Sequence, residues 1–489
     1  MRSNNLSLDG RWRPKGARVP FVMCMLGWML IAPAARADDD VQSLKRQLEA
    51  LQRKIEQLEK NQAQQKATQE KQEQFQKELE AKARKSEETG STPKVVTAGD
   101  IPNSFKFPGM KTSLSIFGFV KGDAVFSSRS AGVNAAADQF FIPALIPVGP
   151  GAGNNEKNQV TFHARQSRIG IRTSTPDTPF GTVTTLIEGD FFGSPLNLDE
   201  TNSNGAALRL RHAYGTIGNL GVGQYWTAFE NAEALPDVLD FGGPVGQIFA
   251  RQAQVRWTQP FRAGSGIKSA SWEVSLENPE SLIANSFGPL FRPDDDRYPD
   301  IVGRVNLSGD WGSFWAAALI RDIRLDAAAN ALGAGSPAVN DNKRGVAGQV
   351  GAMIPLAGFF PALGKDDLRL WLNYGNVIGR YQEFGFFPDG ILINGRIELA
   401  NQLSGFAAYR HFWTPMLRSS FVLSASDADN PAGTPGSTNT SARSFHANLI
   451  WSPITPVDVG LEYLYGRRQI ENGQSGTLNR VQFSAKYAF

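Results

Sequence analysis

The feature that most constrains the fold is an alternation of apolar and polar residues with a period of two, which begins near Ser113 and runs to Phe489. In the segment VQFSAKYAF (481–489) Val481, Phe483, Ala485, Tyr487 and Phe489 fall on one face, and Gln482, Ser484 and Lys486 fall on the other. Such a strand at the edge of a water-soluble sheet would promote aggregation, whereas each strand of a membrane barrel needs one face for lipid and one for the lumen. The pattern therefore predicts an all-β, transmembrane antiparallel barrel, with Phe489 on its C-terminal strand.

The overall composition is compatible with this interpretation. Hydrophobic residues make up 41% of the chain, the mean hydropathy is -0.28, and no segment reaches the roughly 18 consecutive apolar residues of a membrane helix. A β-sandwich would also contain alternating strands, but several apolar faces here end in Trp or Tyr, and the polar faces carry charge in many strands. At roughly 24 residues per strand with its share of loop, residues 113–489 predict a barrel of about 16 strands.

Residues 1–37 have the pattern of a secretory signal peptide. A basic region precedes the apolar run Phe21–Ala32, and Ala35–Ala37 supplies small residues at a cleavage site. The alternative is an uncleaved membrane anchor, although the apolar run is too short to span a bilayer. Removal of this segment would take away the single cysteine, Cys24, and would change the formal charge from +3 to −2. The mature chain would then have no thiol chemistry and no basic excess that predicts nucleic-acid binding.

Residues 38–88 show a helical period in place of the period of two. Apolar residues at heptad positions a and d predict a periplasmic coiled-coil stem that associates copies of the chain, and the same register continues through glutamines. A single charged helix or a disordered spacer is the alternative. Residues 89–112 contain Gly, Ser, Thr and Pro and are predicted to be a linker. The seam residues of the predicted coiled coil are Val41, Leu44, Leu48, Leu51, Ile55 and Leu58.

Several segments of the predicted barrel resemble known porins. The hairpin NQVTFHARQSRIGIRTSTPDTPFGTVTTLIEGDFFG (158–193) resembles an early hairpin of Gram-negative porins in general. The segments YGNVIGRY (374–381), AAYRHFWTPMLRSSF (407–421) and NLIWSPITPVDVGLEYLYGRR (448–468) resemble the DcaP-like trimeric outer-membrane porins more specifically. That family also carries a periplasmic coiled coil before the barrel, so the resemblance extends over most of the chain.

The resemblance implies a homotrimer of 16-stranded barrels in the outer membrane of a Gram-negative bacterium. It also implies that small anionic solutes, with dicarboxylates as the typical class, diffuse through the barrel. Two positions depart from the family pattern: Val377 stands where glycine is more usual, and Arg410 stands where glutamine is more usual. Arg410 adds a charge near the predicted pore wall, which leaves the fit of any particular substrate open.

The basic residues of the barrel indicate how anions could be selected. Residues 100–489 contain 24 Arg, 8 Lys and 34 acidic residues, so the segment is nearly neutral and rich in the side chain that binds carboxylates in a planar, bidentate way. Many arginines fall on the polar faces of predicted strands, Arg209 and Arg480 among them. The predicted pore-lining set is Arg168, Arg172, Arg211, Arg256, Arg304, Arg369 and Arg396. A predicted constriction loop near residues 230–240 would face them with Glu230, Glu233, Asp237 and Asp240.

Other functions remain open at this point. The arginines could pair with acids and merely brace the wall, which would leave a non-selective general porin. An outer-membrane enzyme would need a nucleophile and a base. The best candidate for such a site is His446 with Asn448, near several serines. A hydrogen-bonding role of these residues in the lumen is the simpler interpretation. The stem could instead anchor the outer membrane to peptidoglycan. No metal-ligand spacing or phosphate-binding loop is present, so we expect no cofactor.

Overall fold

The computed structural model describes residues 95–129, 138–149, 157–193, 205–285, 288–382 and 384–489, together with Lys66, Glu70, Gln74 and Lys77. The last four belong to the predicted stem and are helical, with exposed side chains. The predicted seam residues (Val41 to Leu58) and the predicted signal peptide lie outside the described residues. The chain divides into two compact units, residues 1–91 and 92–489. Among the described residues, no helix has the length and apolar character needed to cross a membrane.

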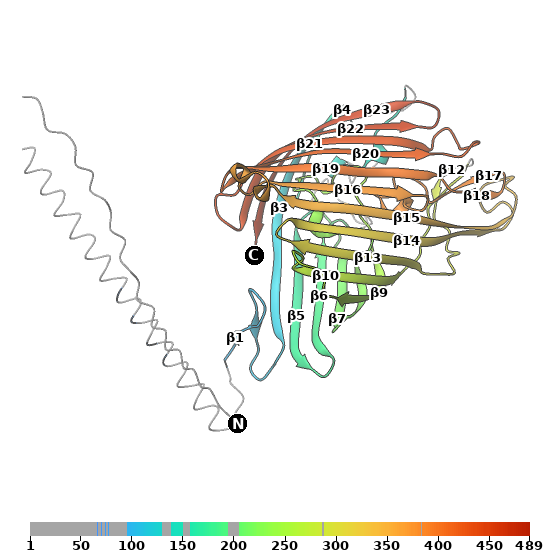
Figure 1. The fold of residues 1–489 in the computed structure, drawn as a ribbon. Helices are drawn as coiled ribbons and strands as arrows, with labels where there is room; N and C mark the ends of the chain where they lie inside the picture. The colour runs from blue at the N-terminus through green and yellow to red at the C-terminus, as the bar shows by residue number, and fades with distance from the viewer. Residues whose placement is uncertain are drawn as a thin grey trace, which may run out of the picture. The chain divides into compact units, whose positions relative to one another are not determined.

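The second unit contains one sheet of nineteen strands and one of four (Figure 1). In the larger sheet β1 and β2 only flank β3, and β4 and β5 form one interrupted strand, so sixteen barrel strands remain within the described residues. The predicted antiparallel barrel of about 16 strands is confirmed. The strands are β1 (Thr97–Ala98), β2 (Phe105–Lys106), β3 (Ser113–Arg129), β4 (Lys157–His163), β5 (Arg168–Thr178), β6 (Gly181–Asp190), β7 (Arg209–Ile217), β8 (Leu220–Trp226), β9 (Arg251–Pro260), β10 (Ser269–Glu277), β13 (Asp300–Gly309), β14 (Gly312–Ala327), β15 (Val339–Pro355), β16 (Asp367–Gly375), β19 (Asn401–Thr414), β20 (Leu417–Asp429), β21 (Asn439–Trp451), β22 (Val457–Ile470) and β23 (Ser475–Ala488).

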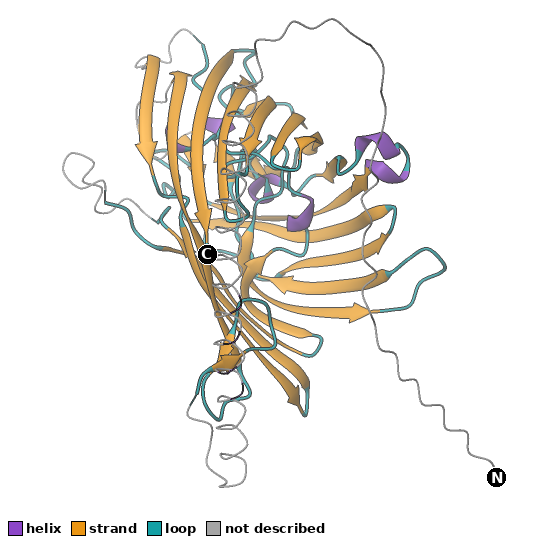
Figure 2. Cartoon of the chain, turned by 90° about the vertical axis from the view of Figure 1, so that its left-hand side faces the viewer, coloured by secondary structure: helices purple, strands orange, loops and turns teal. Residues whose placement is uncertain are grey.

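The remaining elements belong to connections between barrel strands. The smaller sheet consists of β11 (Ile283–Asn285), β12 (Gly288–Phe291), β17 (Gly390–Ile393) and β18 (Arg396–Glu398). Short 3-10 helices lie at η1 (Pro143–Leu145), η2 (Ala232–Ala234), η3 (Leu356–Gly358), η4 (Pro361–Leu363) and η5 (Gly379–Tyr381). Figure 2 shows that strands form most of this unit and that helices are confined to short segments.

The barrel closes where β23 pairs with β3, in a register that runs from Arg480 opposite Ser127 to Ala488 opposite Phe119. Phe489 extends this pairing, because its N–H donates to the carbonyl of Gly118 at 3.0 Å and its carbonyl accepts from the N–H of Gly118 at 3.1 Å. Closure leaves no free sheet edge in the ring, which is what a wall immersed in lipid requires. It also excludes a sandwich of two open sheets.

The two faces of the strands have opposite character. On β23 the side chains of Arg480, Gln482 and Ser484 are buried, whereas Val481 and Phe483 are exposed. The buried face is therefore the polar one, the reverse of a water-soluble protein and the arrangement expected when the exposed face meets lipid. The alternation predicted from the sequence corresponds to these two faces.

The connections differ in length between the two ends of the barrel. Residues 179–180, 218–219, 310–311 and 415–416 form tight turns at one end, while segments such as 227–250, 278–299 and 376–400 connect strands at the other. In outer-membrane barrels the short turns face the periplasm and the longer loops face the outside. The end with the tight turns is therefore the periplasmic end. The loop 227–250 folds into the lumen and shapes the candidate site.

Candidate functional site: the pore constriction

The loop between β8 and β9, residues 227–250, crosses the lumen, and we call it the constriction loop. Its central part is held on the opposite side of the barrel, because the N–H of Leu239 donates to Glu462 Oε2 at 2.7 Å and the carbonyl of Leu239 accepts from Lys121 Nζ at 2.7 Å. Asn448 Nδ2 donates to the carbonyl of Asp237 at 2.8 Å. These buried bonds satisfy backbone groups that would otherwise be costly to enclose.

Two acids of the loop form ion pairs with the same side of the barrel. Arg418 Nε donates to Asp237 Oδ2 at 2.6 Å, and Arg480 Nη1 lies 3.3 Å from Asp240 Oδ2. Asp240 also accepts from the N–H of Phe141 at 3.0 Å, which ties in the loop that follows β3. We call the side of the lumen that carries Lys121, Arg418, Asn448, Glu462 and Arg480 the docked wall. It belongs to β3 and β20 to β23.

A glycine allows the loop to approach the wall closely. Gly246 has a φ of +81°, and a Cβ placed there would lie 2.6 Å from the backbone nitrogen of Gly405 on β19. The carbonyl of Gly246 accepts from Asn373 Nδ2 at 2.8 Å. A side chain at this position would both strain the backbone and push the loop from the wall. The constriction loop is therefore fixed along its length.

The two other acids predicted for the loop are placed differently. Glu233 is exposed, whereas the side chain of Glu230 is buried and neither of its carboxylate oxygens has a hydrogen-bond partner among the described residues. Burial raises the pKa of the Glu230 carboxyl well above its usual range, although the guanidiniums of Arg251, Arg304 and Arg211 act in the opposite direction. Glu230 therefore tends toward the neutral form, unlike a fixed negative charge facing the pore.

Several arginines of the predicted pore-lining set are held in place by acids and loop carbonyls. Arg256 and Arg304 share Glu273 at 3.2 and 2.8 Å, and Arg304 also donates to the carbonyl of Glu230 in the constriction loop. Arg369 bonds Asp367 at 2.8 Å and the carbonyl of Leu235.

Arg410 and Arg396, the second of which belongs to the predicted pore-lining set, are placed differently. Arg410, the departure from the family pattern, also bonds Asp367 and lies 3.8 Å from Asp237. Arg396 is in β18, so it is exposed on a loop sheet and does not belong to the barrel wall.

A neighbouring part of the lumen wall, which meets the docked wall where β5 pairs with β3, carries a group of arginines with fewer acids. Arg211 bonds Glu188 at 2.6 Å and Asp190 at 2.8 Å, Arg209 bonds Asp190 at 2.8 Å, and Arg168 lies 3.8 Å from Glu188. We call the five arginines on β5, β7 and β9 the cationic wall. Its members are Arg168, Arg172, Arg209, Arg211 and Arg251.

Two members of the cationic wall have no carboxylate partner within the described part of the chain. Arg172 is exposed, and its guanidinium lies over the ring of Phe117 at 5.3 Å. Arg251 lies over the ring of Trp226 at 4.8 Å, and its Nη1 has no hydrogen-bond partner among the described residues. The two acids in direct contact with the cationic wall, Glu188 and Asp190, therefore leave a local excess of positive charge.

Two cavities lie beside the constriction loop. One, of about 430 Å³, is bounded by Arg168, Arg172 and Arg211 on the cationic wall and by loop residues from Leu235 to Phe241. The other, of about 330 Å³, contains both signs of charge together with serine and asparagine side chains. Its charged lining residues are Glu230, Glu233, Glu273, Arg256 and Arg304. The first cavity also contains Glu188 and Asp240, and Arg172 is the one arginine of its described lining without a carboxylate partner among the described residues.

Sequence reasoning missed several residues that shape the lumen. Lys121 and Glu462 alternate on polar strand faces like many others, so no local signal marks them as loop anchors. Arg251 is the first residue of β9, directly after the loop, where alternation does not mark it as lumenal. Arg321 is buried between Asp300 at 3.1 Å and Asp389 at 2.5 Å and holds the loop 376–400. Its local sequence RDIR does not alternate.

His446, proposed as part of an enzyme alternative, lies in the docked wall. Its Nδ1 is 3.2 Å from Glu462 Oε1 and its Nε2 is 3.3 Å from Ser444 Oγ, an order that resembles a hydrolase triad. All three side chains are buried, and Ser444 Oγ accepts from the N–H of Val245 in the constriction loop at 3.1 Å. The group therefore supports the loop. In the described part of the chain, no cluster of three or more His, Cys, Asp or Glu residues could hold a metal ion.

Comparison with known proteins identifies the family. The DcaP outer membrane protein family matches residues 31–291. The structure is similar to the crystal structure of the outer membrane channel DcaP of Acinetobacter baumannii, with 23% sequence identity, a TM-score of 0.61, and coverage of 77% of this chain and 97% of that one. OmpT of Vibrio cholerae is more distant, with 9% identity and a TM-score of 0.47 over 78% of this chain and 98% of that one. No curated protein matched the sequence. The chain belongs to the DcaP outer membrane protein family, as its C-terminal motifs predicted, and its β-barrel lies in the outer membrane.

Proposed function

We propose that the protein is a porin through which small anionic solutes diffuse, with short dicarboxylates as the preferred class. The observation that supports this most strongly is the excess of guanidinium over carboxylate on the cationic wall, beside the 430 Å³ cavity that the constriction loop bounds. The family and fold are those of outer-membrane channels. The proposed mechanism is diffusion without chemistry, in which fixed charges replace part of the hydration shell of the solute.

The proposed selectivity rests on how the arginines are distributed. A guanidinium binds a carboxylate through two parallel N–H bonds, but a channel must also release its solute, so binding at each point has to remain weak. Arg172 is exposed and Arg168 is only loosely paired with Glu188 at 3.8 Å. These two residues are four positions apart on one strand face, which separates them by about 13 Å along the strand. A short solute with a carboxylate at each end would therefore meet the two guanidiniums one after the other as it passes along the wall.

Planar-bilayer recording tests the proposal. A reversal potential in a salt gradient should show anion preference, and short dicarboxylates should block the current at lower concentration than monocarboxylates of equal length. A cation preference would contradict the proposal. Equal passage of cations and anions with no dicarboxylate block would favour a non-selective general porin, which the mixed charges of the second cavity would explain.

The oligomer and the stem belong to the same proposal. We infer a homotrimer, held in part by a coiled coil over the seam Val41 to Leu58, because three clean heptads specify association of helices. Deletion of residues 38–88 should weaken the trimer without changing the conductance of each barrel. An anchoring protein with a plugged barrel is the alternative, and liposome swelling separates the two, because a channel admits small solutes and an anchor does not.

A further inference from the structure

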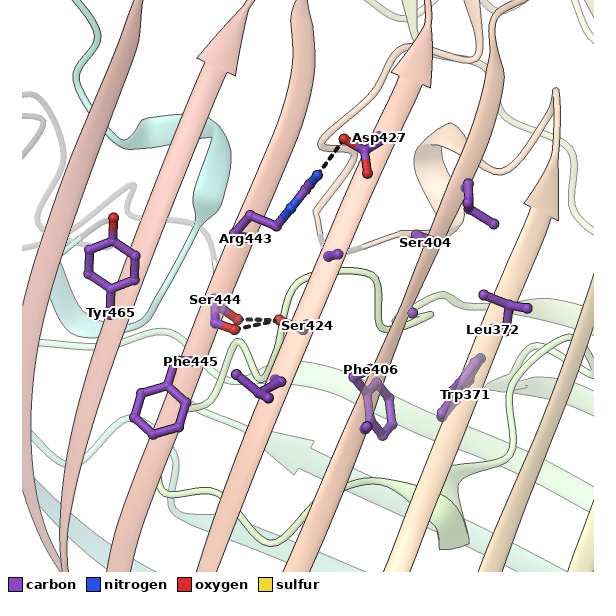
Figure 3. A pocket seen from close by; sticks show the side chains of 15 residues that line it. Trp371, Leu372, Ser404, Phe406, Ser424, Asp427, Arg443, Ser444, Phe445 and Tyr465 are labelled. Carbon is purple, nitrogen blue, oxygen red and sulfur yellow. Dashed lines mark hydrogen bonds and ion pairs between the residues drawn. The ribbon is translucent and has the colours of Figure 1, made fainter.

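Two arginines face each other on the outer surface of the barrel. Arg443 on β21 and Arg467 on β22 are directly opposite in the strand register, and both are exposed. Alternation places them on the same face as Phe445, two residues after Arg443, and Tyr465, two residues before Arg467. Arg443 Nη2 also donates to Asp427 Oδ1 on β20 at 2.7 Å (Figure 3). Like charges directly opposite each other destabilise a strand pair, so the arrangement calls for an anion to neutralise it.

The height of this pair on the barrel corresponds to the lipid headgroups. Trp451 lies at the periplasmic end of β21, where an aromatic girdle is expected, and Arg443 lies near the opposite end of the strand. The stretch between them is about 27 Å long at roughly 3.4 Å per residue, or about 20 Å along the barrel axis at a tilt of ~40°. The apolar band of such barrels is about 25 Å tall. Arg443 and Arg467 therefore lie within about 5 Å of the outer edge of that band, a distance that a long arginine side chain can span to reach the headgroups.

A shallow apolar groove of about 570 Å³ begins beside the arginines. Large outward side chains form the sides of the groove. Its floor is low because two small residues, Gly405 on β19 and Ala425 on β20, lie opposite each other in the register. Asp427 and Arg443 belong to the same lining, so the polar end of the groove is continuous with the charged pair. The outward apolar residues that line it are Leu372, Leu403, Ala407, Leu423, Phe445 and Tyr465.

We propose that this face binds one phosphate-bearing lipid of the outer leaflet, with its phosphate between Arg443 and Arg467 and an acyl chain in the groove. Lipid is the medium that covers the exposed face of a membrane barrel, and a phosphate is the headgroup anion that accepts bidentate bonds from guanidinium. Asp427 orients Arg443 but neutralises only one of the two positive charges. The remaining charge and the adjoining apolar groove complement an anionic lipid as a single ligand.

Native mass spectrometry of the detergent-purified full-length protein, titrated with bis-phosphorylated lipid A, tests this proposal. The double substitution Arg443→Gln/Arg467→Gln should weaken binding about tenfold, since it removes two charge-assisted contacts to phosphate. Arg262→Gln, an exposed arginine near the periplasmic end, is the matched control and should bind like the wild type. Asp427→Asn should strengthen binding severalfold, because it frees Arg443 for the phosphate.

A separate substitution tests the groove. Ala425→Phe fills its floor and should weaken lipid binding while leaving both arginines in place, and circular dichroism with heat modifiability in gels verifies that each variant forms a barrel. Unchanged lipid affinity in the double arginine variant would overturn the proposal. So would a change in the ratio of trimer to monomer with no change in bound lipid, because a second copy of the chain would then cover this face.

Discussion

The docked wall and the cationic wall face the same lumen and use the same kinds of side chain, but their charges are satisfied in different ways. On the docked wall Glu462, Arg418 and Arg480 are bonded to the backbone or acids of the constriction loop. On the cationic wall Arg172 is exposed to the lumen, and Arg251 has no carboxylate partner among the described residues. Whether a charged side chain has an ion-pair partner, more than its residue type, decides whether it stabilises the fold or can contact a solute.

The difference has an energetic basis. A buried ion that loses its partner destabilises a protein by several kcal/mol, whereas an exposed ion contributes little to stability. Substitutions on the docked wall should therefore change the structure of the constriction, and substitutions on the cationic wall should change selectivity while the barrel stays intact.

The largest effect should come from Glu462→Ala on the docked wall. It removes the acceptor for the N–H groups of Leu239 and Asp240 and the partner of His446, and it should lower the free energy of unfolding by about 3 to 5 kcal/mol. Single-channel conductance should rise as the constriction loop loosens. Glu398→Ala is the control, since Glu398 is only partly buried and its ion pair with Lys343 measures 3.9 Å. Equal effects of the two substitutions would contradict the role of the docked wall.

A smaller effect, on selectivity, should follow from Arg168→Gln/Arg172→Gln on the cationic wall. Each charge contributes about 0.5 kcal/mol to the energy of an anion ~8 Å away in water, so losing both should lower the anion-to-cation permeability ratio about fivefold. Reversal potentials in a salt gradient measure this ratio. Arg396→Gln should leave this permeability ratio unchanged, because β18 belongs to the smaller sheet and not to the barrel wall. A fall in conductance without a shift in reversal potential would mean that these arginines do not select ions.

The opposite change on the same wall should have the opposite sign. Glu188→Gln removes one of the acids that neutralise Arg211 and Arg168, at 2.6 and 3.8 Å. The free positive charge should raise the permeability ratio about twofold, by the same estimate of ~0.5 kcal/mol for one charge. A ratio that stays constant would show that the cationic wall lies outside the ion path.

The smallest effect should come from Glu230→Gln in the constriction loop, and the effect should depend on pH. Burial raises the folded-state pKa of Glu230 above the ordinary value of 4.5, so wild-type stability should fall as pH rises from that value toward the folded-state pKa. The glutamine variant lacks this loss. Thermal unfolding followed by tryptophan fluorescence should show equal stability near pH 4 and a more stable variant at pH 8. A less stable variant at pH 8 would mean that the carboxylate is ionised and paired.

Much of the fold could be predicted from the sequence, because strand alternation is a local signal. Val481 and Phe483 on one face and Gln482 on the other could be read within a few residues, and the structure places these two faces as expected. The C-terminal motifs led to the family for the same reason. The position of Phe489 beside Gly118, in contrast, follows from closure of the ring.

The division between anchoring and solute-facing charges could not be predicted from the sequence, because it depends on pairing between distant segments. The sequence predicts that Asp237 and Asp240 supply a negative field at the constriction. In the structure Arg418 and Arg480, which lie on strands much later in the chain, neutralise them. Arg369 and Arg172 have similar local surroundings in sequence, and only the fold shows that one binds the loop and the other does not. The predicted stem has no such test, since its seam lies outside the described residues.

The junction between β3 and β23 has a consequence for how the barrel is made. Ser127 and Arg480 are hydrogen-bonded although 353 positions separate them, so the ring cannot close before its C-terminal strand has arrived. Until then β3 and β22 each present an unpaired edge that would accept a strand from any neighbouring chain. Biogenesis of this protein must therefore shield two edges at once, and a helper that imitates a strand at either edge would solve the problem.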